Sequence, residues 1–269
     1  MSVLRFGARG SEVIALQQAL NGKGFGPLDS DGIFGAGTEK AVKRFQWASG
    51  LGVDGVVGAN TWKSLEEPQE QPQPSVSDAH PTVITALETK GYKIYTDGKI
   101  NIIGVRSKNP ISNSFDDELH LAWVKNGLWQ HHKYRATCDP GSFWLEHPGK
   151  SAGTAILVPG QYEDVYKFDL HAGKYRTLCQ RNGKVSVWRD SNKDDVLDWQ
   201  DGNAGVEGWY GINLHHAGTN STRVDKWSAG CQVWARLADW EEAMKICEDS
   251  GAETFTYTLI TEDDVPEGG

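Results

Sequence analysis

A stretch rich in proline, glutamine and glutamate interrupts the chain and limits what it can fold into. Residues 66–78 read EEPQEQPQPSVSD and offer almost no apolar side chain for burial. Such a segment favours an extended chain, so the residues before and after it must build separate cores. The sequence therefore predicts a small domain at 1–66, a linker at 67–79, a larger domain at 80–262 and an acidic tail at 263–269.

Composition excludes several classes of partner. The formal net charge is −9 and Lys and Arg form no basic run, which argues against a nucleic-acid ligand. No run reaches the roughly 18 apolar residues of a membrane span, so no membrane insertion is expected. The start of the chain, MSVLRFGARGSEV, lacks the layout of a secretory signal, so we expect synthesis in a cytoplasm without export by that route. The four cysteines lack paired spacing and are expected to be free thiols of a monomer.

The first 65 residues contain an internal echo. DGIFGAGT at 31–38 and DGVVGANT at 54–61 each place Asp-Gly, which suits a tight turn, before a threonine that is a good helix N-cap. Upstream, SEVIALQQALNGKG repeats its apolar residues at helical spacing and ends in glycines. The pattern predicts three short helices, two of them capped by Thr38 and Thr61.

These motifs resemble a known family. LRFGARGSEVIALQQAL, DGIFGAGTEKAVKRFQ and GLGVDGVVGANTW are similar to the peptidoglycan-binding domain type 1 that occurs on many wall-active enzymes. The resemblance covers about the first 65 residues and implies that bacterial peptidoglycan is the partner. Most of the matched residues would be needed for the core of any three-helix domain. The assignment of peptidoglycan as the ligand therefore rests on the family resemblance and not on the residue pattern.

The second domain is predicted to be mostly β. Its β-branched and aromatic runs are separated by Gly, Pro, Asn and Asp, namely YKIYTDGKINIIGVRS, SAGTAILVPG, KVSVWRD and ETFTYTLI. One clear helix comes late, in LADWEEAMKICEDSG, and its apolar stripe places Cys247 in the core. The fold class is thus multidomain α+β, with a three-helix N-terminal module, a linker and a mostly-β C-terminal domain carrying a late α-helix.

A candidate nucleophile and base lie in NLHHAGTNSTRVDKWSAGCQVW, residues 213–234. Strand alternation before the histidines sends His215 to the polar face, and a polar, glycine-containing loop lets the chain fold back toward Cys231. A thiol is a weak nucleophile until an imidazole takes its proton. Ser228 and Gly230 flank a turn whose backbone N–H groups could stabilise an oxyanion. Spacing alone leaves purely structural roles for these residues as an equal alternative.

The segment also resembles a catalytic family. GINLH followed by SAGC is similar to the L,D-transpeptidase (YkuD-like) domain, whose motif is a histidine, a spacer and Ser/Thr-His-Gly-Cys. The resemblance implies Cys231 as nucleophile, His215 as base and peptidoglycan stem peptides as substrate, with His216 as orienting group or alternative base. TCDPGSFWL at 137–145 is similar to a family segment that precedes a strand. The family's motif histidine is Ala229 here, and Val233 stands where an arginine or asparagine is common, which leaves fine substrate recognition open.

Two further groups of residues are candidates for binding. Polar and aromatic side chains that could line a substrate groove are Tyr162, His171, Gln180 and Trp227. Oxygen ligands at alternate positions resemble the start of a calcium loop, namely Asp190, Asn192, Asp194 and Asp198. An acidic turn held by Asx hydrogen bonds explains the same four residues equally well, and no cofactor is required by the predicted chemistry.

These features predict a modular peptidoglycan hydrolase that cleaves stem-peptide or cross-bridge bonds through an acyl-enzyme. The lack of an export signal favours an endolysin-like enzyme that reaches the wall after lysis. The alternatives are an L,D-transpeptidase that forms cross-links, and a non-catalytic wall-binding or phage structural protein.

Overall fold

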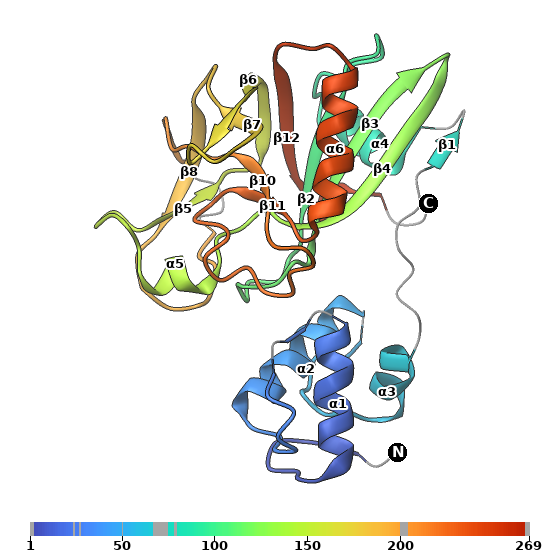
Figure 1. Cartoon of the computed structure of the whole chain (residues 1–269), viewed down its shortest axis with the longest axis vertical. Helices are drawn as coiled ribbons and strands as arrows, with labels where there is room; N and C mark the ends of the chain where they lie inside the picture. The colour runs from blue at the N-terminus through green and yellow to red at the C-terminus, as the bar shows by residue number, and fades with distance from the viewer. Residues whose placement is uncertain are drawn as a thin grey trace. The chain divides into compact units, whose positions relative to one another are not determined.

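The computed structural model describes residues 3–23, 25–26, 28–49, 51–66, 75–77, 80–199 and 204–266. The chain divides into two compact units, of which the first contains three helices and the second contains the strands (Figure 1). Of the predicted linker at 67–79, only Ser75–Ser77 lies within the described residues, and the tail is described as far as residue 266. No helix among the described residues is both long and apolar enough to cross a bilayer.

The N-terminal unit confirms the three predicted helices, α1 (Ser11–Gly22), α2 (Ala36–Ala48) and α3 (Ala59–Glu66). Val13, Leu16 and Leu20 recur at intervals of three and four residues on α1, so they share one face. All three are fully buried, together with apolar residues of the other two helices. This small core accounts for the apolar pattern of the module.

The predicted N-caps are wrong. Helices α2 and α3 begin two residues before Thr38 and Thr61, so both threonines lie inside the first turn. Their hydroxyls instead donate to the carbonyls of Ile33 and Val56, each at 3.4 Å. A threonine hydroxyl near the start of a helix can accept from a helix N–H as a cap or donate to a carbonyl of the preceding turn. Here both threonines donate to the preceding turn.

The sequence echo reflects a repeated hydrogen-bond network. In the first copy the buried Gln17 amide donates to the Asp31 carboxylate at 2.9 Å and accepts from the Gly32 N–H at 3.0 Å. In the second copy Gln46 binds Asp54 at 2.8 Å and the Gly55 N–H at 2.9 Å. Each Asp-Gly turn is therefore held by a glutamine from the preceding helix.

The second unit follows a mostly β order. Its elements are β1 (Ser75–Ser77), α4 (Thr82–Thr89), β2 (Asn101–Arg106), β3 (Asp117–Lys125), β4 (Leu128–Thr137), α5 (Ser142–Glu146), β5 (Thr154–Leu157), β6 (Gly160–His171), β7 (Tyr175–Gln180), β8 (Val185–Asp190), β9 (Val206–Gly208), β10 (Leu214–His216), β11 (Gln232–Trp234), α6 (Leu237–Asp249), β12 (Phe255–Thr261) and the 3₁₀ turn η1 (Glu262–Asp264).

The main sheet closes on itself. Its strand order is β1-β4-β11-β10-β7-β6-β12-β2-β3, and an additional pairing joins the last strand, β3, to β4, the neighbour of β1. A second sheet has the order β5-β8-β9. Most neighbours are antiparallel, whereas β10 pairs with β11, and β12 with β2, in parallel. Because β10 and β11 are parallel, the loop that links them has to run back from the end of β10 to the edge of the sheet where β10 begins.

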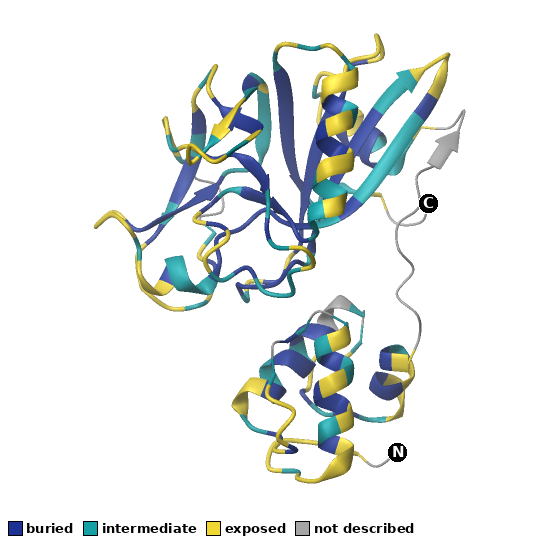
Figure 2. Ribbon diagram, in the orientation of Figure 1, coloured by how far each residue is buried: buried dark blue, intermediate teal, exposed yellow. Residues whose placement is uncertain are grey.

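The barrel core is built from the alternating inner residues of these strands, and buried segments line its interior in Figure 2. Helix α6 packs on β10 and β11 and contributes the fully buried Cys247, which confirms its predicted place in the core. The late helix and the mostly β domain confirm the predicted fold class.

Local differences from the predictions have clear causes. Only Asn101–Arg106 of the run at 92–107 forms a strand, since the Asp97-Gly98 turn interrupts it. The segment 137–145, expected to precede a strand, includes most of the short helix α5, and the next strand, β5, begins at Thr154. Ser75–Ser77, predicted as linker, pairs with β4 and so belongs to the sheet.

Candidate active site around Cys231

The parallel pair β10–β11 brings the predicted nucleophile and base to one face. Leu214 lies opposite Gln232 and His215 opposite Val233, which places Cys231 level with Asn213 one residue earlier. Paired residues of parallel strands point to the same side, and alternate residues along a strand share a face. Cys231, Asn213 and His215 therefore lie on the same face of two neighbouring strands.

The Cys231 thiol is half-buried and held as a neutral group. The Asn213 N–H donates to its sulfur at 3.4 Å, and the thiol donates to the Gly211 carbonyl at 3.6 Å. Burial raises the pKa of the Cys231 thiol to about 11, and the Asn213 N–H offsets this only in part. A thiol that both donates and accepts hydrogen bonds is consistent with this protonated state.

His215 has the tautomer that a base requires. Its Nδ1 lies 2.9 Å from the His216 carbonyl, and because a carbonyl can only accept, Nδ1 must carry the proton. The lone pair is then on Nε2, which is buried and has no hydrogen-bond partner. Burial lowers the pKa of His215 to about 3, and the neighbouring His171 adds to this effect. The imidazole is therefore neutral and able to accept a proton through Nε2.

No hydrogen bond joins the sulfur to His215 in the described residues, since Nε2 has no partner and the thiol faces Gly211. Proton transfer thus requires the thiol hydrogen to turn from the Gly211 carbonyl toward Nε2. Catalytic hydrogen bonds often form only when substrate is bound, so this geometry is compatible with a base role.

His171, predicted to bind substrate, lies beside the candidate base His215. Its ring stacks on the His215 ring with centroids 4.1 Å apart and planes 26° apart. Its Nδ1 lies 3.0 Å from the Asn213 amide nitrogen, a donor, which assigns the ring proton of His171 to Nε2. Burial lowers the pKa of His171. His171 therefore packs against His215 and has an N–H of its own at Nε2.

His216 packs among aromatic rings beside His215. Its ring lies between Tyr175 at 4.5 Å and Trp240 of α6 at 4.6 Å, and the Tyr175 hydroxyl lies 3.4 Å from Nδ1 of His215. The Nδ1 of His216 binds the Ala217 carbonyl. This placement favours His215 over His216 as the base.

The turn before Cys231 is held by its own serine. The buried Ser228 hydroxyl donates to the Cys231 carbonyl at 2.8 Å and accepts from the Gly230 N–H at 3.1 Å. The Gly230 N–H is thereby occupied, so among the N–H groups of this turn it is not available to stabilise an oxyanion. Gly230 adopts a φ of +118°, and a Cβ there would lie 2.4 Å from the Ala155 carbonyl oxygen, so only glycine fits.

The other predicted groove residues are placed differently. Gln180 is buried at 2% exposure, and its Oε1 accepts from the N–H groups of Tyr210, Gly211 and Ile212. It therefore holds the loop whose Gly211 carbonyl meets the thiol, and it does not face a substrate. Tyr162 directs its hydroxyl to the Val158 carbonyl at 2.5 Å, also inside the protein.

Trp227, in contrast, remains 44% exposed beside the Ser228 turn and is open to contact with a ligand.

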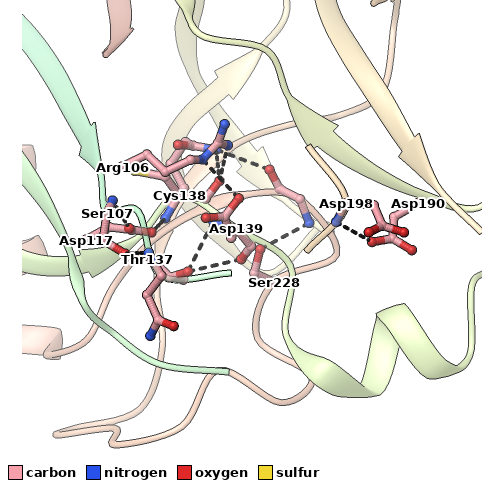
Figure 3. Close-up of polar contacts among 12 residues, drawn as sticks. Arg106, Ser107, Asp117, Thr137, Cys138, Asp139, Asp190, Asp198 and Ser228 are labelled. Atoms are coloured by element: carbon pink, nitrogen blue, oxygen red, sulfur yellow. Dashed lines mark hydrogen bonds and ion pairs between the residues drawn. The ribbon is translucent and has the colours of Figure 1, made fainter. Parts of the chain in front are cut away.

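The candidate calcium loop forms an Asx-bonded turn. The Asn192 amide donates to Asp194 at 3.0 Å and to Asp198 at 2.6 Å. The Asp198 N–H donates to the Asp190 carboxylate at 3.1 Å (Figure 3). Within the described ranges no group of three or more His, Cys, Asp or Glu side chains is arranged to hold a metal. Calcium binding stays a prediction, and the arrangement matches the alternative, an acidic turn.

A buried ionic cluster lies beneath the Cys231 turn. Arg106, 1% exposed, pairs with Asp139 at 3.0 Å and donates to the Cys138 carbonyl at 3.1 Å (Figure 3). Burial opposes the charge of Arg106, but Asp139 nevertheless holds its pKa above the usual value. Sequence reasoning missed this cluster, because its members are far apart in the chain and no local motif marks them.

A separate cavity of about 400 Å³ lies between α4, the β2–β4 strands and the C-terminal segment. Its lining includes His120 and His131, whose rings are joined by a 2.9 Å hydrogen bond, and Glu118, which binds His120 at 3.0 Å. None of the predicted site residues lines it. The spacing of His120 and His131 in the sequence gave no signal for this pairing.

One family model and several known proteins match this chain. Residues 9–65 match the family model described as a putative peptidoglycan binding domain. The chain is 46% identical over 63 residues to the spore cortex-lytic enzyme of Bacillus cereus, a match that covers 23% of this chain and 24% of that protein. The match thus spans about a quarter of the relative's length.

Among solved structures, the SleB N-terminal domain is 45% identical, with 24% of this chain and 88% of that chain covered and a TM-score of 0.24. The L,D-transpeptidase of Xylanimonas cellulosilytica is 21% identical, with 97% and 98% covered and a TM-score of 0.29.

Proposed function

We propose that the chain is a modular cell-wall hydrolase. The N-terminal module would bind bacterial peptidoglycan, and the second unit would cleave peptide bonds in the stem or cross-bridge. The family match at residues 9–65 supports the binding half of this proposal. The catalytic half is carried by one observation: Cys231 shares a face with a histidine whose Nδ1 is bound to a carbonyl and whose Nε2 is unoccupied.

The reaction would proceed by general-base activation of a neutral thiol. The Cys231 sulfur attacks the peptide carbonyl carbon while Nε2 of His215 takes the thiol proton. The tetrahedral intermediate collapses to a thioester, and the same proton passes to the departing amine. Water then attacks the thioester, loses a proton to His215 and releases the acid, which regenerates the thiol. An amine acceptor in place of water would give the transpeptidase reaction.

Because the proposed substrate is peptidoglycan, the protein would act at the bacterial wall. We also propose that it degrades the wall and lyses cells, as an endolysin does. Turbidity of a suspension of permeabilised cells would fall on addition of the protein if this role is correct.

The test is mass spectrometry of purified peptidoglycan after incubation with the wild type or with Cys231→Ala. New free termini made only by the wild type support hydrolysis, whereas new cross-links indicate transfer. Pelleting with the wall and no chemical change in either sample would leave binding as the function and refute the catalytic half.

A further inference from the structure

The residue that follows the nucleophile, Gln232, is completely buried and binds three groups, two of which are distant in the chain. Its Oε1 accepts from the Tyr257 hydroxyl at 2.6 Å, and its Nε2 donates to the carbonyls of Gly230 at 3.2 Å and Cys138 at 3.3 Å. Both amide hydrogens are thus used on backbone carbonyls. A buried amide whose oxygen and both N–H groups are all hydrogen-bonded forms a rigid link between its partners.

The partners of Gln232 are themselves anchored. The Cys138 carbonyl also accepts from Arg106, which is paired with the buried Asp139. The Tyr257 hydroxyl occupies space that exists only because Gly104 lacks a side chain, since a Cβ there would lie 1.9 Å from the hydroxyl oxygen. The amide of Gln232 therefore connects the Cys231 turn to an immobile part of the barrel.

This link determines the direction of one backbone group at the thiol. A peptide unit is planar and trans, so an N–H points opposite to the carbonyl of the preceding residue. Gln232 draws the Gly230 carbonyl inward, which turns the Cys231 N–H away from the buried amide. In the described part of the chain this N–H has no acceptor, whereas Ser228 occupies the neighbouring Gly230 N–H.

We propose that Gln232 is a positioning residue that aims the Cys231 N–H at the oxyanion formed when the thiol attacks. The inference rests on the proposed function, because it requires Cys231 to attack a carbonyl. The N–H of a nucleophile can stabilise the tetrahedral intermediate only if its direction is set before the reaction. Gln232 does this without touching the substrate.

The test compares Gln232→Leu with the wild type on soluble cross-linked muropeptides. Loss of an aimed oxyanion donor is expected to lower kcat by roughly 10²-fold with little change in KM. The rate of Cys231 alkylation by iodoacetamide should stay the same, since alkylation at a saturated carbon forms no oxyanion. A purely structural role would lower both rates together.

A matched control is Gln161→Leu. The Gln161 amide bridges the Lys93 N–H and carbonyl, each at 2.9 Å, and the Thr258 hydroxyl at 3.1 Å, on β6 away from the thiol. This variant should lose thermal stability but keep kcat. If Gln232→Leu does not fold, Tyr257→Phe loosens the same amide by removing one hydrogen bond, and we expect about a fivefold fall in kcat.

The inference is overturned if the folded variants keep kcat near the wild-type value, or if alkylation falls in step with kcat. A wild type without Cys231-dependent cleavage would instead refute the proposed function, and the inference with it.

Discussion

At the level of single residues, the surroundings of Cys231 and His215 favour a neutral pair over a thiolate and imidazolium. Burial raises the pKa of the thiol and lowers that of the imidazole, so each group prefers its uncharged form. Proton transfer would then accompany attack on the substrate and would not precede it.

This state predicts the pH dependence of thiol reactivity. With a thiol pKa of about 11, the thiolate fraction grows tenfold per pH unit, so alkylation of Cys231 by iodoacetamide should rise steadily between about pH 6 and about pH 9. Mass spectrometry of the Cys231 peptide measures the rate. A rate that is already at a plateau near neutral pH would reveal a preformed ion pair instead.

Gly230 is predicted to be intolerant of any side chain. Gly230→Ala would combine a φ of +118° with a Cβ 2.4 Å from the Ala155 oxygen, at a cost of about 2–4 kcal/mol in the free energy of unfolding. Gly173→Ala is the control, since Gly173 has a φ of +70° but open space around its Cβ position. Denaturant unfolding should show the smaller loss, about 1 kcal/mol, for the control. Equal losses would mean that the contact with Ala155 relaxes freely.

At the level of elements, much of the architecture could be predicted from local patterns. Apolar residues recur with a helical period of about 3.6 residues in SEVIALQQAL and in residues 237–249. Both segments are helices in the structure, as this period predicts. Alternation before His215 placed it on the same side as Asn213, even though the hydrogen-bonded strand begins only at Leu214. The candidate pair could therefore be named from sequence.

What could not be predicted depends on contacts between distant residues. Gln180 looked like a groove residue because a polar side chain gives no sign of which backbone groups it will meet. The sequence does not reveal that the Gly230 N–H is taken up by Ser228 and so is not free for an oxyanion, because this hydrogen bond depends on the geometry of the turn. Gln232 has no local signal in the sequence, since its partners Cys138, just after β4, and Tyr257 of β12 are distant in the chain.

The repeated glutamine networks give a prediction for the helical module. Gln17→Leu would keep the buried volume but leave the Gly32 N–H without its acceptor, which should cost about 2 kcal/mol or more. Gln18→Leu alters the exposed neighbour on α1 and should be nearly neutral. Calorimetry of the full chain, together with pelleting on peptidoglycan, measures both. Equal stability of the two variants would show that the network contributes little.

At the level of the whole molecule, a wall-binding unit tethered to a catalytic unit should raise the local concentration of substrate. Deletion of residues 1–70 keeps Ser75–Ser77 paired with β4. The shortened chain should act much more weakly on intact wall while keeping its rate on soluble muropeptides. The two rates are measured by release of soluble fragments and by chromatography. A similar loss on both substrates would contradict a tethering role.

The central claim is that Cys231 forms a covalent acyl-enzyme. It is tested most directly by mixing the protein with a soluble cross-linked muropeptide, quenching in acid and digesting for mass spectrometry. The account predicts an acyl adduct on the peptide that contains Cys231, absent from Cys231→Ala, which should also release no product. Product release by Cys231→Ala at the wild-type rate, with Cys231 of the wild type unmodified, would contradict it.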